Sequence, residues 1–430
     1  MTSDMAIREV IGRRVWDSRG RPTVEAEIRL ADGSVGRAIA PAGASRGTHE
    51  AVELRDNDKA FGGQGVTKAL AGVRDVIRPA LLGRPVDDQS GIDACLLALD
   101  GTAQKARLGG NATIAVSMAA AHAAAASAGV PLWRHLAAGN TVQLPMPMVQ
   151  LFGGGAHAGR RIDLQDFLIV PLGAHSFDEA MVMAAEVYRA GGALMADRGL
   201  LRGVADEGGW WPEFSSNEEA LDRTVQAIER ANYRPGADVA IAIDVAASQL
   251  RHDGRYRLAA DREELDSGAL VARLTQWCGR YPIISVEDPV AEDDDEGMRL
   301  FTVAVRDRVQ VIGDDYLVTS ADRVRAAAAR GACNAALIKP NQAGTLTETR
   351  AAFDSARAAQ WRTVISARSG ETEDVTIMHL AVGWKADQLK VGSFARSERM
   401  AKWNEGIRIE ETLGAQTTFA GRAAVGGAKR

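Results

Sequence analysis

The sequence predicts an α/β protein in which a small N-terminal α+β domain precedes a (β/α)8-type barrel. Three observations favour this fold. The chain has 430 residues, which is more than one ordinary domain holds. Residues 6–40 alternate apolar and polar side chains, whereas the C-terminal two-thirds alternates short apolar runs with helical stretches. We therefore divide the chain into an N-terminal domain, residues 1–140, and a barrel domain, residues 141–430.

The N-terminal domain is predicted to begin with three antiparallel strands. Turn signals at Ser18-Arg19-Gly20 and at Ala31-Asp32-Gly33 separate the alternating segments. Residues 50–138 are then typical of helices, several of them rich in alanine and leucine. The most apolar long stretch, residues 112–133, is mostly alanine and is interrupted by polar side chains. It therefore favours a buried helix over a membrane span.

The barrel is predicted from about Val142 to about residue 410. Five apolar runs of β-favouring residues lie in this part, and their continuous apolar character is typical of parallel strands that are buried on both faces. Chemistry in such barrels takes place at the carboxyl ends of the strands. The residues after about 412 are small and polar, and we expect this tail to be loosely held. In chain order the five runs end at Asp244, Glu287, Asp314, Lys339 and the pair Arg368-Ser369.

Composition excludes several classes of protein. There are 51 basic and 56 acidic residues and no basic stripe, which argues against a nucleic-acid partner. The first residues lack the apolar core of a signal peptide, so we expect neither secretion nor a membrane association. The three cysteines, Cys95, Cys278 and Cys333, have neither disulfide nor metal spacing. Together these features predict a protein of the reducing cytoplasm.

Three of the strand-end residues predict a metal site. Asp244, Glu287 and Asp314 are separated by 43 and 27 residues, which matches one or two strand-helix units of a barrel. Three neighbouring carboxylates repel one another unless a cation lies between them, and oxygen ligands suit Mg²⁺. The alternative is three separate acids that are solvated at loops.

Other residues predict acid–base chemistry. Lysine is scarce in this chain, yet Lys339 and Lys390 both lie in apolar strand contexts, where a shielded lysine can act as a base or hold an anion. Glu207 precedes two glycines and two tryptophans. This pattern is consistent with a desolvated carboxylic acid and also with a plain turn. His157 and Asp166 lie in a glycine-rich segment that is not a dinucleotide fingerprint. Taken alone, His157 is equally consistent with a packed histidine.

With these residues in place, the chain resembles enolase over nearly its whole length. The resemblance implies an α+β domain against an atypical eight-stranded barrel, and a homodimer or a higher oligomer, since Arg14 and Glu410 lie in segments that resemble enolase dimer contacts. The matching segments are WDSRGRPTVE, GASRGTHEAVELRD, GGNATIAVSMA, GGGAHAG, ADEGG, IDVAAS, VEDP, IGDD, KPNQAGTLTET, SARSGETED and RSERMAKWNEGIRIEE.

The resemblance also implies a reaction, the dehydration of a phosphorylated or phosphonylated glycerate with two Mg²⁺ ions per site. Lys339 is implied to remove the proton α to the substrate carboxylate. Glu207, in an acid cluster with Asp166, is implied to help protonate the departing hydroxide. The implied ligands of the tighter Mg²⁺ are Asp244, Glu287 and Asp314. The implied substrate-binding residues are Arg368 and Ser369 at the phosphate, Lys390 at the carboxylate, and Ser45 and His157 on loops that close over the substrate, Ser45 also reaching the second Mg²⁺.

The departures from the enolase pattern cluster around the substrate. Enolases have histidine where this chain has Ala367, threonine where it has Arg46, and glutamate where it has Asp166. Losing a histidine and gaining an arginine makes room for, and compensates, a further anionic group on phosphorus. The sequence therefore predicts a divergent paralogue, such as one that forms carboxyphosphonoenolpyruvate in phosphinothricin-type natural-product biosynthesis. Alternatives are an ordinary phosphopyruvate hydratase, a non-catalytic enolase-like binding protein, and another reaction of the superfamily such as acid-sugar dehydration.

Overall fold

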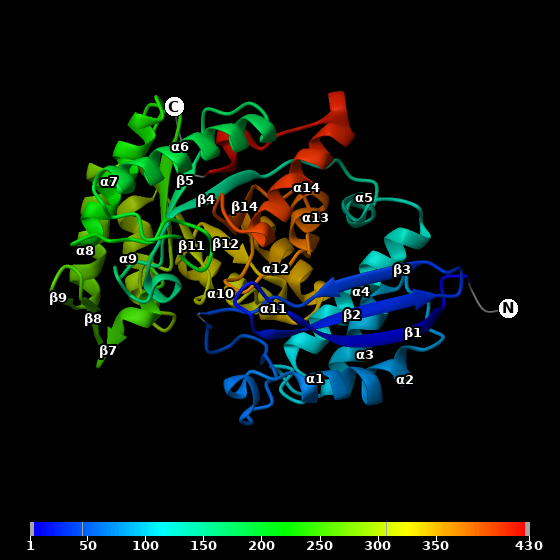
Figure 1. The fold of residues 1–430 in the computed structure, drawn as a ribbon. Helices are drawn as coiled ribbons and strands as arrows, with labels where there is room; N and C mark the ends of the chain where they lie inside the picture. The colour runs from blue at the N-terminus through cyan, green and yellow to red at the C-terminus, as the bar shows by residue number, and fades with distance from the viewer. Residues whose placement is uncertain (1–3, 45, 307, 426–430) are drawn as a thin grey trace.

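The computed structural model describes residues 4–44, 46–306 and 308–425. Its N-terminal part contains an antiparallel sheet of three strands in the order β1 (Ile7–Trp16), β2 (Pro22–Leu30) and β3 (Val35–Ile39). Figure 1 shows this sheet in blue beside the larger barrel. The predicted meander is therefore present, with both turns where the glycine signals place them.

Helix α4 (Gly110–Ser127) packs against this sheet and is buried along nearly its whole length. Its small side chains allow a very close approach, because a Cβ at Gly36 of β3 would lie 2.1 Å from the backbone nitrogen of Ala123. The alanine-rich stretch is thus the buried helix that the sequence predicts. The remaining helical segments of this part are Ala60–Gly63, α1 (Thr67–Gly72), η2 (Val73–Ile77), α2 (Arg78–Leu81), α3 (Gln89–Asp100) and α5 (Leu132–Ala137).

The prediction of helix from residue 50 onward is wrong for its first ten residues. The chain between residues 50 and 59 is irregular, and its first α-helix begins at Thr67. The reason lies in its hydrogen bonds: the backbone of Val52 pairs with Gln104 and Gly110, and Ala51 pairs with Gln342 of the barrel. Backbone groups that serve as ties between distant segments are not free for helical bonds.

The barrel domain is a closed eight-stranded barrel, as predicted. Neighbouring strands follow the order β10-β11-β12-β13-β14-β4-β5-β6, and the last strand pairs with the first. The five strands that the sequence singled out are all parallel to their neighbours in that set. The barrel strands are β4 (Met146–Gly153), β5 (Asp166–Val170), β6 (Ala240–Asp244), β10 (Ile283–Glu287), β11 (Gln310–Gly313), β12 (Ala335–Ile338), β13 (Arg362–Ser366) and β14 (Gln388–Gly392).

Strand β5 is the exception to parallel order, since it runs antiparallel to both β4 and β6. The connection from β4 to β5, residues 154–165, contains only the short helical segment Gly155–Ala158. A parallel return normally needs a crossover helix, whereas an antiparallel neighbour does not. The amino end of β5, Asp166, therefore lies at the same end of the barrel as the carboxyl ends of the other strands.

Most helices around the barrel begin at a residue that the sequence marks. Ser176, Ser216 and Thr345 each accept a hydrogen bond from the backbone of a glutamate three residues on, and Asp266 and Asp294 cap two further helices in the same way. These helices are α6 (Phe177–Asp197), α7 (Asn217–Arg230), α8 (Ser267–Arg280), α9 (Asp295–Val305), α10 (Ala321–Arg330), α11 (Pro340–Ala343), α12 (Leu346–Ala358), α13 (Thr376–Gly383) and α14 (Ser397–Leu413). A small sheet, β7 (Arg251–His252), β8 (Arg255–Leu258) and β9 (Glu263–Leu265), precedes α8.

The tail after α14 is not loosely held up to residue 425, contrary to the expectation. Ala424 and Val425 are buried in the apolar cluster inside the barrel together with Met146 and Met148. The amide of Gln388 also donates a 2.9 Å hydrogen bond to the carbonyl oxygen of Ala424. The small side chains that suggested looseness are what fits inside the barrel.

Of the helices in the described part of the chain, none combines the length and apolar character that a bilayer span requires. The three cysteines are free thiols, and Cys278 and Cys333 are buried.

Candidate active site

The strand-end residues converge on one mouth of the barrel. Asp244 and Glu287 are the last residues of β6 and β10 and lie opposite each other in register. Asp314 and Lys339 directly follow β11 and β12. Most of the predicted site residues line a single pocket, which includes His157, Asp166, Glu207, Asp244, Lys339, Arg368, Ser369 and Lys390.

Lys390 lies in the middle of an acidic cluster. Its ammonium nitrogen is 2.9 Å from Asp244 Oδ2, 2.9 Å from Glu287 Oε2 and 3.1 Å from Asp166 Oδ2. Burial opposes the charge on Lys390, but these carboxylates outweigh it, and the pKa of Lys390 is raised well above its usual value. The lysine therefore stays protonated and holds three acids together.

Lys339 is paired with Asp314, at 2.5 Å between Nζ and Oδ2. Burial lowers the pKa of Lys339, but Asp314 outweighs burial and the net shift is upward. The other carboxylate oxygen, Oδ1, accepts a 2.9 Å hydrogen bond from Gln342. In this arrangement Lys339 carries a proton.

The donor set at these strand ends fits a hard divalent cation. Asp244, Glu287 and Asp314 offer carboxylate oxygens, which Mg²⁺ prefers. Glu287 Oε1 is buried and has no hydrogen-bond partner among the described residues. Burial first, and then repulsion from Asp244, raises the pKa of Glu287 well above its usual value. The two lysines therefore do not neutralise all the negative charge of the cluster, and a bound cation would stabilise the acids further.

The predicted metal ligands are nevertheless not the most compact group of acids. Asp288 belongs to a tighter one, but its oxygens are used by the loop: they accept backbone hydrogen bonds from Asp314 at 2.9 Å and Asp315 at 2.7 Å. It is therefore a loop-forming residue. The described residues hold two groups whose ligand atoms all lie within 4.8 Å of one another: His157, Asp166 and Glu207, and Asp288, Asp314 and Asp315.

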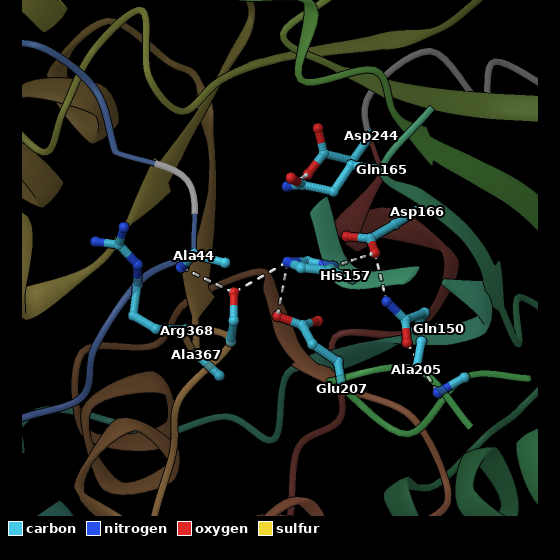
Figure 2. Close-up of polar contacts among 12 residues, drawn as sticks. Ala44, Gln150, His157, Gln165, Asp166, Ala205, Glu207, Asp244, Ala367 and Arg368 are labelled. Atoms are coloured by element: carbon cyan, nitrogen blue, oxygen red, sulfur yellow. Dashed lines mark hydrogen bonds and ion pairs between the residues drawn. The ribbon is translucent and has the colours of Figure 1, made fainter. Parts of the chain in front are cut away.

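His157 connects the acids at the other side of the pocket (Figure 2). Its Nδ1 is 3.2 Å from Asp166 Oδ1, and its Nε2 is 3.0 Å from Ser369 Oγ and 3.7 Å from Glu207 Oε1. Burial lowers the pKa of His157, but Glu207 and Asp166 together outweigh burial and raise it. His157 is thus neither solvated nor a simple core residue, and it can share a proton with either acid.

Glu50 is a site residue that the sequence reasoning missed. Arg368 donates to it with both terminal nitrogens, at 2.8 Å and 3.3 Å, and both side chains are buried. Glu50 also accepts from the backbone N–H of Gly47 at 2.9 Å and from Gln342 at 3.2 Å. It therefore ties the loop of residues 41–47 to the predicted phosphate-binding arginine. The available signal was its position, as an acid three residues after Gly47.

Arg46 is not among the residues that line the pocket. Its guanidinium pairs with Glu53, which also pairs with Arg55, and the Arg46 side chain is 46% exposed. The sequence placed this cation beside the substrate, whereas the structure places it on a local carboxylate. Ser45, the other predicted residue of this loop, lies outside the described residues.

Ala367 is part of the pocket wall, beside Arg368. Its backbone N–H donates a 2.8 Å hydrogen bond to the carbonyl oxygen of Lys390, which fixes its position against β14. The methyl side chain is 6% exposed. Any larger side chain here would enter the space next to the arginine.

Comparison with known protein families matches almost the whole chain. Residues 7–136 match the family described as Enolase, N-terminal domain. Residues 141–427 match the family described as Enolase, C-terminal TIM barrel domain. Together with the eight-stranded barrel and the acids and lysines at its mouth, these matches show that the chain belongs to the enolase family.

Proposed function

We propose that this member of the enolase family is a Mg²⁺-dependent hydro-lyase that removes water from a 2-phosphoglycerate-like acid. We further propose that its favoured substrate carries a carboxylate on phosphorus, so that the product is carboxyphosphonoenolpyruvate. One observation supports the proposal: Lys339, Lys390, Glu207, Arg368 and Ser369 line a single pocket, and the residue beside Arg368 in its wall is Ala367.

The substrate is bound at both ends by cations of the chain. The ammonium of Lys390 binds the substrate carboxylate, and Arg368 with Ser369 binds the group on phosphorus. Arg368 is already oriented before the substrate binds, because Glu50 holds its guanidinium. Substrate positioning of this kind supplies much of the rate enhancement.

Proton transfers are assigned to two residues that line the pocket, Lys339 and Glu207. Lys339, released from Asp314, removes the proton α to the carboxylate. Glu207, next to His157, protonates the hydroxide as it leaves the adjacent carbon. Asp244, Glu287 and Asp314 would hold Mg²⁺, and the bound ion would supply positive charge that stabilises the enolate.

A second candidate is ordinary phosphopyruvate hydratase, which acts on 2-phosphoglycerate itself. One observation favours it: Arg46, the cation expected to compensate an extra anionic group, is bound to Glu53 outside the pocket. The preference for the larger substrate then rests on Ala367 alone.

The two candidates differ in kcat/KM for the two substrates. We expect the purified protein with Mg²⁺ to favour the carboxyphosphonate, and Ala367→His to shift the kcat/KM ratio toward 2-phosphoglycerate by about tenfold or more, because the ring fills the space beside Arg368. Arg46→Thr is the matched control and should leave the ratio nearly unchanged.

Lys339→Ala should abolish both reactions. A wild type that prefers 2-phosphoglycerate, with a ratio that Ala367→His does not move, would retire the special substrate. Mg²⁺ binding without turnover of either acid would favour the binding-protein alternative.

The homodimer stays a prediction. Trp16 and Phe61 are 51% and 47% exposed and lie edge to face, with the guanidinium of Arg14 5.4 Å from the Phe61 ring centre. Exposed aromatic residues of this kind are common at protein–protein contacts. Glu410 is used within the chain, where it accepts the backbone N–H groups of Phe177 and Asp178.

A further inference from the structure

Gln150 is a fully buried amide of β4 beside the acidic wall of the pocket (Figure 2). Its Nε2 donates a hydrogen bond to Asp166 Oδ1, and its Oε1 accepts one of 2.8 Å from the backbone N–H of Gly209. These partners fix the orientation of the amide, because a flipped amide would set oxygen against carboxylate and N–H against N–H.

The amide connects the two segments that carry the acids of the site. Asp166 begins β5, and Gly209 lies two residues after Glu207. The turn that contains Glu207 is closed by a 2.8 Å hydrogen bond from Ala205 N–H to the Gly209 carbonyl oxygen. A displacement of Gln150 therefore reaches both carboxyl groups.

The Gln150 amide is packed tightly between Gly209 and Asp166. A Cβ at Gly209 would lie 2.5 Å from Gln150 Oε1, so only glycine permits the approach. The backbones of β4 and β5 are joined in antiparallel register, with Gly153 opposite Asp166. Because the strands fix the separation of the backbones, the lengths of the Gln150 and Asp166 side chains have to match each other.

We propose that Gln150 is a positioning residue that sets the placement of the Asp166 and Glu207 carboxyl groups around His157. Delivery of the proton to the leaving hydroxide depends on that placement. The inference deepens the proposed function, and its kinetic consequence rests on it. Gln150 makes no hydrogen bond to Lys390, Arg368 or Ser369 among the described contacts, so the loss should appear in kcat and not in KM.

The first test replaces Gln150 by the nearly isosteric Met. We expect kcat to fall about 10- to 100-fold while KM changes less than about threefold, which is the usual cost of misplacing a catalytic group. The matched control is Asn334→Leu. Asn334 is also a bridging amide, since it accepts from Val311 N–H at 2.7 Å and donates to the Val309 carbonyl at 3.2 Å, at the opposite end of the barrel. An equal kcat for the two variants would overturn the proposal.

The second test needs no substrate. Backbone hydrogen exchange of residues 204–211 should be faster in Gln150→Met than in wild type, because the Gly209 N–H loses its acceptor. Asn334→Leu should leave this segment unchanged. Unaltered exchange in Gln150→Met would refute the positioning role even if no substrate turns over, so this failure is separate from a failure of the proposed function.

The third test uses the matched lengths. Asp166→Glu adds one methylene and Gln150→Asn removes one, so each single variant should lose kcat. The double variant restores the combined length of the two side chains. Its kcat should be at least about tenfold higher than that of the Asp166→Glu single variant. A double variant no better than the worse single variant would contradict the length argument.

Discussion

Single buried charges determine the state of the site. Lys390 contacts three carboxylates, and two of them, Asp244 and Glu287, have no other ion-pair partner among the described residues. Breaking a buried ion pair by removing one partner is costly, because the remaining charge is left desolvated. A divalent cation at the same acids supplies charge of the same sign, so the ammonium and the metal stabilise the cluster by the same means.

Lys390→Met should therefore make stability depend on Mg²⁺. Without metal we expect a loss of about 3–5 kcal/mol in the free energy of unfolding, since three acids lose their cation. Added Mg²⁺ should restore more stability to the variant than it adds to wild type. Thermal unfolding at several Mg²⁺ concentrations measures both effects.

Lys105→Met is the matched control for that experiment. Lys105 is also a buried lysine, 2.7 Å from Glu348, and among the described residues it forms no ion pair with Asp244, Glu287 or Asp314. It should lose stability without gaining any dependence on Mg²⁺. If both variants respond to Mg²⁺ as wild type does, the strand-end acids do not form the metal site.

The residues whose place could be predicted are those that a strand positions. Asp244 and Lys339 follow apolar runs, and parallel strands bring their carboxyl ends together. The place of Arg46 could not be predicted, because its partner Glu53 lies in an irregular segment with no periodic signal. Glu50 was missed because its partner Arg368 is 318 residues away in the sequence.

Elements show the same division between local signal and distant contact. The meander, the buried helix and the helix caps follow from local patterns of alternation, alanine content and Ser/Thr/Asp positions. The irregular residues 50–59 and the packed tail depend on contacts with distant segments, which no local pattern reports. The reversed direction of strand β5 could be predicted only in part. The missing helix between β4 and β5 indicates it, but only once both strands have been located in the sequence.

The packed tail can be tested at Ala424, which is 1% exposed inside the barrel cluster. Ala424→Asp should destabilise the protein by at least about 2 kcal/mol, because a carboxyl group enters an apolar cavity without a partner. The neighbouring Ala423 is exposed, and Ala423→Asp is the control. Well below the unfolding temperature, kcat should be equal in both variants. Equal unfolding temperatures would show that the tail is loose after all.

Considered as a whole molecule, the site depends on both parts of the chain. The Glu50–Arg368 pair joins the loop after the N-terminal sheet to the barrel mouth. Elsewhere, Asp93 of α3 accepts hydrogen bonds from the backbone and hydroxyl of Thr347, and Ser117 of α4 accepts one from Leu346. Figure 1 shows these N-terminal helices beside the barrel helices α11 and α12. If the two parts separated, Arg368 would therefore also lose its ion pair with Glu50.

Two neighbouring histidines lie at this contact between the parts, the half-buried His122 and the buried His379. His122 of α4 is 2.8 Å from the hydroxyl of Thr376 in α13, and its ring centre is 6.4 Å from that of His379. Burial first, with a contribution from His122, lowers the pKa of His379 to about 4, although Glu405 and Asp374 act in the opposite direction. His379 Nδ1 has no hydrogen-bond partner among the described residues, which suits a neutral ring.

This pair predicts a loss of stability in mild acid. A histidine whose folded pKa lies below its unfolded value stabilises the protein above about pH 6.5 and loses that contribution as the pH falls toward about 4. Between about pH 7.5 and about pH 5 the loss from His379 should be about 2 kcal/mol. His379→Gln keeps a donor for Glu405 but does not titrate. Urea unfolding at the two pH values should therefore show a decrease in the free energy of unfolding that is about 2 kcal/mol smaller in this variant than in wild type. His252→Gln, at an exposed histidine, should behave as wild type. If His379→Gln loses as much stability as wild type does, the contact between the parts is not where acid acts.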